Sequence, residues 1–124
     1  MSPRVLLVDD DPTIVRLLEV NFRLGGFEIE IASGGEAAVR LATTSPPDAI
    51  VMDVMMPGLG GFEVAQLLRE SPPLAETPIV FLTARPGVDA GGTDSLGRVD
   101  VVAKPFDPAG LVELVRTRIE ESAA

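Results

Sequence analysis

Short apolar runs and stretches of helical periodicity alternate along the whole chain. Residues 4–9 (RVLLVD) form an apolar, β-branched run, which is typical of a strand covered on both faces. From Pro12 the spacing becomes helical, and this helix is expected to end at Gly25-Gly26. Its predicted buried stripe is Ile14, Leu17, Leu18 and Phe22. The same alternation predicts further strands over 27–32, 48–53, 77–83 and 99–103, and further helices over 35–43, 61–70 and 108–121.

Strands that alternate with helices indicate right-handed βαβ units and a largely parallel sheet between helix layers. The joining segments have ordinary loop lengths, and the sequence contains no linker, repeat or low-complexity tract. We therefore expect a single α/β domain over residues 1–124, with three layers and a doubly wound sheet.

The segment 85–98 (RPGVDAGGTDSLGR) departs from this pattern. It stands where a fourth helix is due, yet it holds one proline and four glycines. Each glycine inside a helix costs about 1 kcal/mol relative to alanine. A short or partly irregular helix is expected there.

Composition narrows the function classes. Nineteen acidic residues against ten basic ones give a net charge of −9, which argues against direct binding of nucleic acid or an anionic membrane. Cysteine and histidine are absent, so a metal or acid–base site must use carboxylates, hydroxyls and lysine. No apolar run approaches the roughly 20 residues that span a bilayer. We expect a soluble, cytoplasmic protein.

Chemically capable residues stand at the carboxyl ends of four predicted strands. Ligands of open parallel sheets bind outside these ends. The residues at the ends of strands one, three, four and five are Asp9, Asp10, Asp53, Thr83 and Lys104. Each one alone has an ordinary structural explanation, as a turn residue, a helix cap or a surface lysine. Their joint occurrence predicts one site with three carboxylates, a hydroxyl and an ammonium.

Such a cluster of carboxylates requires a compensating cation. An all-oxygen ligand set without histidine or cysteine suits Mg²⁺. Mg²⁺ and lysine around a carboxylate are equipped to stabilise a phosphoryl group in transfer. Because the sequence has no GxxxxGK[ST] loop for nucleotide phosphates, a side chain is the expected phosphoryl acceptor, and Asp53 is the best candidate.

Four motifs carry a resemblance to a known family. In order and approximate spacing, the chain resembles the receiver domains of two-component response regulators. The matching motifs are VLLVDDDP, DVMMPGLGGFE, the TA of FLTAR, and VVAKPF. The resemblance extends over essentially the whole chain. It implies a flavodoxin-like (βα)5 fold with strand order 2-1-3-4-5. It also implies a phosphoacceptor that serves a sensor histidine kinase or phosphotransfer protein and signals to an effector protein or a C-terminal output domain.

The same resemblance assigns roles within the site. Asp53 would be phosphorylated, Asp10 would bind Mg²⁺ directly, and Asp9 would bind it largely through water. The backbone carbonyl of Met55 would complete the protein ligands of the metal. Thr83 would donate a hydrogen bond to a phosphoryl oxygen, and Lys104 would pair with the phosphoryl group. The Lys104-Pro105 peptide bond is expected to be cis, which would aim Lys104 into the site. Such a domain is not an enzyme, although it assists its own phosphorylation and dephosphorylation.

Several positions depart from the family pattern. Three residues before Lys104, where many receivers have Tyr or Phe, this chain has Val101. Receivers attached to winged-helix domains use a Glu and an Arg of the last helix for dimerisation, and Gly110 and Leu114 stand at those positions here. Asp100 is the one familiar acid that is left in that patch. We hypothesise that phosphorylation orders the 85–98 segment. An ordinary rigid helix of poor propensity is the open alternative for that segment.

Three other function classes share parts of this pattern. A pseudo-receiver that acts as a protein-interaction module without phosphorylation stays open, although the complete residue set argues against it. A phosphatase of the haloacid-dehalogenase kind needs an acid two residues after the nucleophile, and Met55 stands there. A flavodoxin-like FMN carrier needs a phosphate-binding loop and stacking aromatics, and the chain has neither Trp nor Tyr.

Overall fold

A parallel five-stranded sheet forms the centre of the computed structural model, which describes residues 2–84 and 94–123. Its strand order is β2-β1-β3-β4-β5, which confirms the predicted topology. The strands are β1 (Arg4–Val8), β2 (Glu28–Ala32), β3 (Ala49–Asp53), β4 (Ile79–Thr83) and β5 (Val99–Ala103). The helices are α1 (Pro12–Leu24), α2 (Gly35–Thr44), α3 (Gly61–Arg69) and α4 (Pro108–Ala123), with 3₁₀ turns η1 (Pro72–Leu74) and η3 (Asp94–Leu96).

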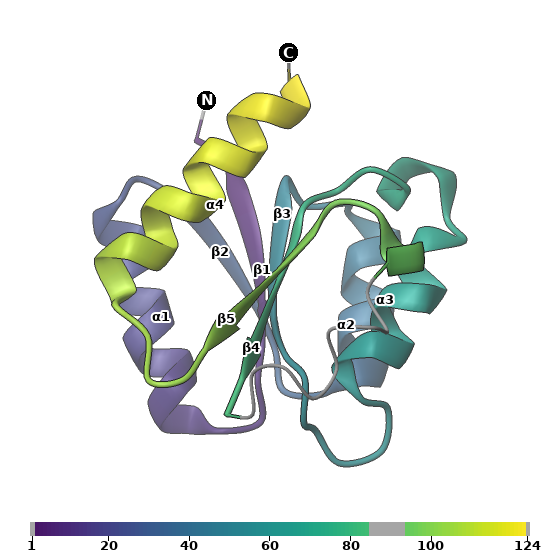
Figure 1. Ribbon diagram of the computed structural model, residues 1–124, viewed down its shortest axis with the longest axis horizontal. Coiled ribbons are helices and arrows are strands. Elements are labelled where there is room, and N and C mark those ends of the chain that lie inside the picture. Colours follow the sequence, from purple (N-terminus) through teal and green to yellow (C-terminus); the bar gives the residue numbers. More distant parts are fainter. Residues whose placement is uncertain (1, 85–93, 124) are drawn as a thin grey trace.

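Helices cover both faces of the sheet, so the molecule has three layers (Figure 1). The helices α1 and α4 lie on one face, and α2 and α3 lie on the other. Because neighbouring side chains of a strand point to opposite faces, β1 contributes to both cores. Val5 and Leu7 belong to the α1/α4 core with Phe22, whereas Leu6 and Val8 belong to the α2/α3 core.

The element boundaries agree with the sequence expectations to within one or two residues. The fifth strand is as predicted, and α4 extends two residues further than expected. One burial prediction is wrong, because Leu17 is 39% exposed whereas Leu18 and Phe22 are buried. Each residue turns a helix by about 100°. Leu17 therefore lies on the flank of α1 when Leu18 faces the core.

The segment 85–98 is described only at its end. Residues 94–96 form η3, and Gly97, two residues before β5, has a left-handed φ of 77°. The remainder of that segment, and with it the expected irregular helix and its proposed ordering on phosphorylation, lies outside the described residues. Across the two described stretches, no helix combines the length and the apolar character that crossing a membrane requires.

Candidate functional site

The carboxyl ends of the strands meet at one edge of the sheet, at the bottom of Figure 1. Asp53 is the last residue of β3 and Thr83 is the last residue of β4. Asp9 follows β1 directly, and Lys104 follows β5. The parallel register between neighbouring strands brings these residues together, as in the pairing of Thr83 with Ala103. The structure thus gathers the residues that the sequence predicted for one site.

Three carboxylates form a compact cluster at this edge. One oxygen each from Asp9, Asp10 and Asp53 lies within 4.8 Å of the other two. Asp9 is 1% exposed and Asp53 is 7% exposed, whereas Asp10 is open to solvent. Two buried acids beside a solvent-accessible one are suited to hold a cation that enters from water.

Lys104 balances part of this negative charge. Its Nζ lies 3.6 Å from Oδ2 of Asp9 and 3.6 Å from Oδ1 of Asp53. The backbone N–H of Lys104 donates a 2.8 Å hydrogen bond to the carbonyl of Thr83, which continues the β4–β5 pairing beyond the strand end. The Lys104-Pro105 bond is cis, as expected from the sequence. One ammonium therefore bridges the two buried carboxylates.

The two oxygens of Asp9 have different environments. Oδ1 accepts a 2.9 Å hydrogen bond from the backbone N–H of Asp11. Oδ2 is buried and has no hydrogen-bond partner among the described residues. The pKa of Asp9 is raised above 3.8, mainly because the carboxyl group is buried. The negative charge of Asp53 also raises this pKa, whereas the backbone N–H of Asp11 and the ammonium of Lys104 lower it. The buried Oδ2 oxygen accepts no hydrogen bond from the described residues, pairs with Lys104 only at 3.6 Å and lies next to two other carboxylates, which fits a divalent cation with oxygen ligands.

Asp11 differs in role from the two acids before it. It is the N-cap of α1, where its Oδ1 accepts a 2.9 Å hydrogen bond from the N–H of Thr13, and Pro12 occupies the first helical position. Its side chain caps the helix while its backbone N–H holds Asp9. The acidic run at the end of β1 therefore divides into a site pair, Asp9 and Asp10, and a helix cap.

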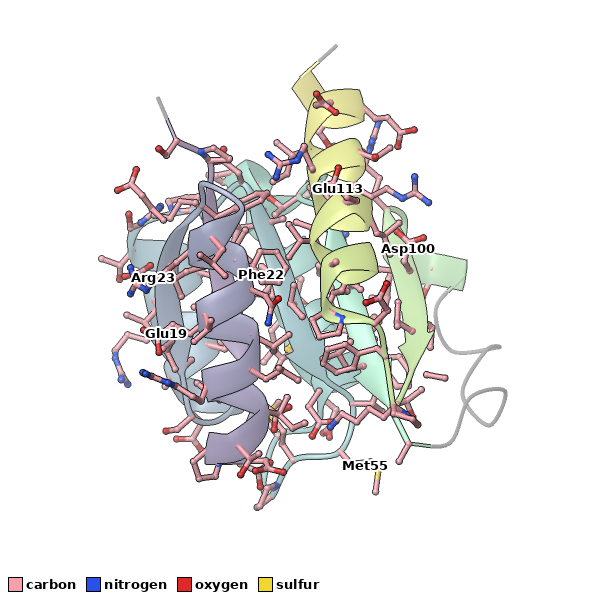
Figure 2. The ribbon with its side chains drawn as sticks, turned by 90° about the vertical axis from the view of Figure 1, so that its left-hand side faces the viewer. Glu19, Phe22, Arg23, Met55, Asp100 and Glu113 are labelled. Atoms are coloured by element: carbon pink, nitrogen blue, oxygen red, sulfur yellow. The ribbon has the colours of Figure 1, made fainter. Side chains whose placement is uncertain are left out.

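Met55 lies beside the cluster through its backbone. Its N–H donates a 3.3 Å hydrogen bond to Oδ1 of Asp53. The residue is 68% exposed, and its side chain projects from the lower edge of the molecule (Figure 2). Thr83 is 3% exposed. The metal-binding role of the Met55 carbonyl and the phosphoryl contact of Thr83 stay predictions.

Asp100 has a partner that the sequence did not reveal. Arg118 of α4 donates two hydrogen bonds to it, from Nε to Oδ2 at 2.8 Å and from Nη2 to Oδ1 at 3.0 Å. Figure 2 shows Asp100 on the strand beside α4. No local spacing signals this pair, because its members come from different elements. Asp100 is thus paired within the chain, with an arginine of α4.

The chain is similar to known proteins in both sequence and fold. Residues 5–116 match the family model of the response regulator receiver domain. Transcriptional regulatory protein PrrA of Mycobacterium leprae is 42% identical over 125 residues, which cover 99% of this chain and 52% of PrrA. The chain therefore spans about half the length of this relative.

Two solved receiver domains have closely similar folds. The receiver domain of Francisella response regulator 1452 has a TM-score of 0.88 and 30% identity, covering 98% of this chain and 99% of that chain. The receiver domain of the sensor histidine kinase PA1611 of Pseudomonas aeruginosa has a TM-score of 0.88 and 30% identity, covering 97% of this chain and 99% of that chain. The PA1611 domain was solved with a magnesium ion coordinated in its active-site cleft.

Proposed function

The chain belongs to the response regulator receiver domain family of two-component signalling, and on that premise we propose that Asp53 accepts a phosphoryl group from a sensor histidine kinase or a phosphotransfer protein. The observation that carries this proposal is the contact between Asp53 and Lys104, 3.6 Å from Oδ1 to Nζ, beside the Asp9–Asp10 pair. Asp53 is held at the end of β3 by the β3–β4 pairing, and the exposed Asp10 of the same cluster opens the site to solvent.

The transfer is a displacement at phosphorus. A carboxylate oxygen of Asp53 attacks the phosphoryl group of a phosphohistidine on the partner, an O–P bond forms, and the P–N bond breaks. The imidazole leaves with the electron pair of that bond, and the product is an aspartyl phosphate. Lys104 stabilises the negative charge of the phosphoryl oxygens, because its ammonium already lies between Asp9 and Asp53. Thr83, at the neighbouring strand end, donates a hydrogen bond to one of these oxygens.

We also propose a Mg²⁺ site made by the carboxylates of Asp9, Asp10 and Asp53 and the backbone carbonyl of Met55. Oδ2 of Asp9 supports this proposal, because it is buried and has no hydrogen-bond partner among the described residues, while its ion-pair partner Lys104 lies 3.6 Å away. When bound, Mg²⁺ supplies positive charge that neutralises the oxygens of the phosphoryl group in transfer. The carboxylates bind and orient, and Lys104 carries a fixed charge that does not depend on the metal.

The domain is a signalling component and not an enzyme with a separate substrate. Hydrolysis of the aspartyl phosphate within the same site is part of the proposal. Residues 1–124 would act as one receiver unit in the cytoplasm. Because PrrA is about twice as long and is a transcriptional regulatory protein, the signal would pass to a C-terminal output domain or a separate effector protein.

Incubation with a small-molecule phosphodonor tests the phosphoacceptor proposal. With Mg²⁺ present, intact-mass analysis should find one added phosphoryl group, and chelation of the metal should prevent it. A protein that remains unlabelled in Mg²⁺, while a known receiver in the same tube is labelled, would contradict the proposal and favour a pseudo-receiver.

A further inference from the structure

The first residue of α3 lies directly against the backbone of Asp53. A Cβ added to Gly61 would come 2.5 Å from the carbonyl oxygen of Asp53 and 3.0 Å from the Cα of Val54. Real Cβ atoms essentially never approach other heavy atoms within 3.0 Å. Both of these neighbours are backbone atoms, so no side-chain rotation relieves the clash. Gly61 therefore leaves space for the end of β3.

Space, and not backbone conformation, requires glycine at this position. Among the described residues, the glycines with left-handed φ are Gly26, Gly58 and Gly97, whereas Gly61 belongs to α3. The N–H of Gly61 also donates a 2.9 Å hydrogen bond to the carbonyl of Val54. Gly61 thus contacts the chain on both sides of the peptide bond that joins Asp53 to Val54.

We infer that Gly61 is a positioning residue. By lacking a side chain, it lets the backbone of Asp53 and the following residues take the position in which the Asp53 carboxylate lies beside Asp9 and Lys104. This inference rests on the proposed function of Asp53 as the phosphoacceptor. Met55 lies two residues after Asp53, so a displacement of this segment would also move its carbonyl, the fourth proposed ligand of the metal.

Neither the end of β3 nor α3 can move away from this contact without losing packing or hydrogen bonds. Asp53 pairs with Leu82 in the sheet, and the N–H of Val54 donates a 3.0 Å hydrogen bond to the Leu82 carbonyl. On the other side, Val64 and Leu68 of α3 are fully buried. A methyl group at Gly61 must therefore displace the end of β3 and the segment that follows it, which carry Asp53 and Met55, instead of moving either element as a whole.

The chain offers a matched control at the adjacent glycine. A Cβ at Gly60 would meet Oε1 of Glu63 at 3.3 Å and the carbonyl of Val54 at 3.4 Å. The first of these is the end of a flexible side chain, and the second is close to ordinary contact. Gly60 has φ −76° and ψ 166°, which alanine adopts without strain. Gly60→Ala thus adds the same methyl group without touching Asp53.

The experiment compares wild type, Gly61→Ala, Gly60→Ala and Leu68→Ala. Leu68→Ala lowers stability from within α3, away from Asp53, and so controls for loss of folding alone. Mg²⁺ affinity is measured by calorimetry on folded protein, and the amide and carbonyl shifts of residues 53–55 are measured by NMR. Gly61→Ala should bind Mg²⁺ at least about tenfold more weakly, as displaced supporting residues do at other metal sites. The two control variants should keep wild-type affinity and wild-type shifts at 53–55.

Equal Mg²⁺ affinity and unchanged shifts in folded Gly61→Ala would overturn the inference, as would an equal loss of affinity in Leu68→Ala. If Gly61→Ala does not fold, a Mg²⁺ titration of the wild type followed by NMR tests the inference instead. The amide resonance of Gly61 should shift with the same midpoint as that of Asp53. A Gly61 resonance that does not move would overturn the inference. A wild type that binds Mg²⁺ but takes no phosphoryl group would contradict the proposed function alone, because the affinity and shift comparison does not depend on phosphorylation.

Discussion

The Nζ of Lys104 lies 3.6 Å from Oδ1 of Asp53, although the two residues come from β-strand ends that are separated by β4 in the sheet. The same Nζ lies 3.6 Å from Asp9. This geometry makes the lysine the fixed cation of a site whose remaining side chains are acids or a hydroxyl. Substitutions of Lys104 or of the acids should therefore act mainly by changing the net charge of the site.

Replacement of Lys104 by Met should slow phosphoryl labelling by a small-molecule donor by about a hundredfold, the typical loss of a preorganised group that stabilises transition-state charge. The measurement is the initial rate of mass gain in saturating Mg²⁺. Arg40→Met removes one exposed cation from α2 and controls for net charge. A rate for Lys104→Met equal to that of Arg40→Met would show that Lys104 does not act on the phosphoryl group.

Substitution of the neighbouring acids Asp10 and Asp11 should have different effects on Mg²⁺ binding and on stability. Asp10→Ala should abolish the rise in melting temperature that Mg²⁺ gives the wild type, because it removes the solvent-accessible carboxylate of the cluster. Asp11→Ala should keep that response and lower stability by about 1 kcal/mol through loss of the α1 cap. Its backbone N–H, which holds Asp9, is retained. Thermal unfolding with and without Mg²⁺ measures both effects, and loss of the Mg²⁺ response in Asp11→Ala would contradict this division.

Asp9 should reduce the stability of the metal-free protein at neutral pH. Its folded-state pKa is raised above 3.8, mainly by burial, so the folded state holds this proton more tightly than the unfolded state. The stability contributed by this group therefore falls as the pH rises through its folded pKa. Asp9→Asn should be more stable than wild type at neutral pH, and the difference should shrink as the pH falls toward 3.8.

Urea unfolding across this pH range checks the prediction for Asp9. Mg²⁺ should reverse the order of stability at neutral pH, because the metal stabilises only the protein that retains the carboxylate. A pH-independent difference between Asp9→Asn and wild type would mean that titration of Asp9 does not cause it.

The Asp100–Arg118 pair should contribute modestly to stability. Both side chains are partly exposed, at 26% and 33%, and such pairs contribute about 0.2–1 kcal/mol. A double-mutant cycle with Asp100→Asn and Arg118→Met should give a coupling energy in this range that declines as salt is added. Zero coupling at low salt would show that the pair does not hold α4 to β5.

The elements of this fold follow from local pattern, because strand and helix periodicities are properties of short windows. The site followed from the strand ends, since parallel strands bring Asp53, Thr83 and Lys104 to one edge whatever the loops do. The cap at Asp11 was also predictable, because a cap depends on residues within one helical turn of each other. Each of these features is local or fixed by topology.

Other features depend on distances between elements, and the sequence could not supply them. Leu17 fits the apolar stripe of α1, yet its exposure depends on the rotation of that helix against the sheet. Arg118 has no sequence relation to Asp100. Gly61 is one of three glycines between Asp53 and Phe62, and only the packing of α3 against Asp53 distinguishes it from the other two. The segment 85–98 still lies mostly outside the described residues, so its predicted ordering remains a hypothesis. Hydrogen exchange with and without a phosphoryl mimic would test it.

The identity of the phosphorylated residue tests the central claim most directly. Wild type and Asp53→Asn are incubated with a small-molecule phosphodonor and Mg²⁺, and intact mass and the modified peptide are determined by mass spectrometry. We predict one phosphoryl group on the wild type, on the peptide that contains Asp53, and none on Asp53→Asn. An adduct of equal extent on Asp53→Asn would contradict the assignment of Asp53 as the phosphoacceptor.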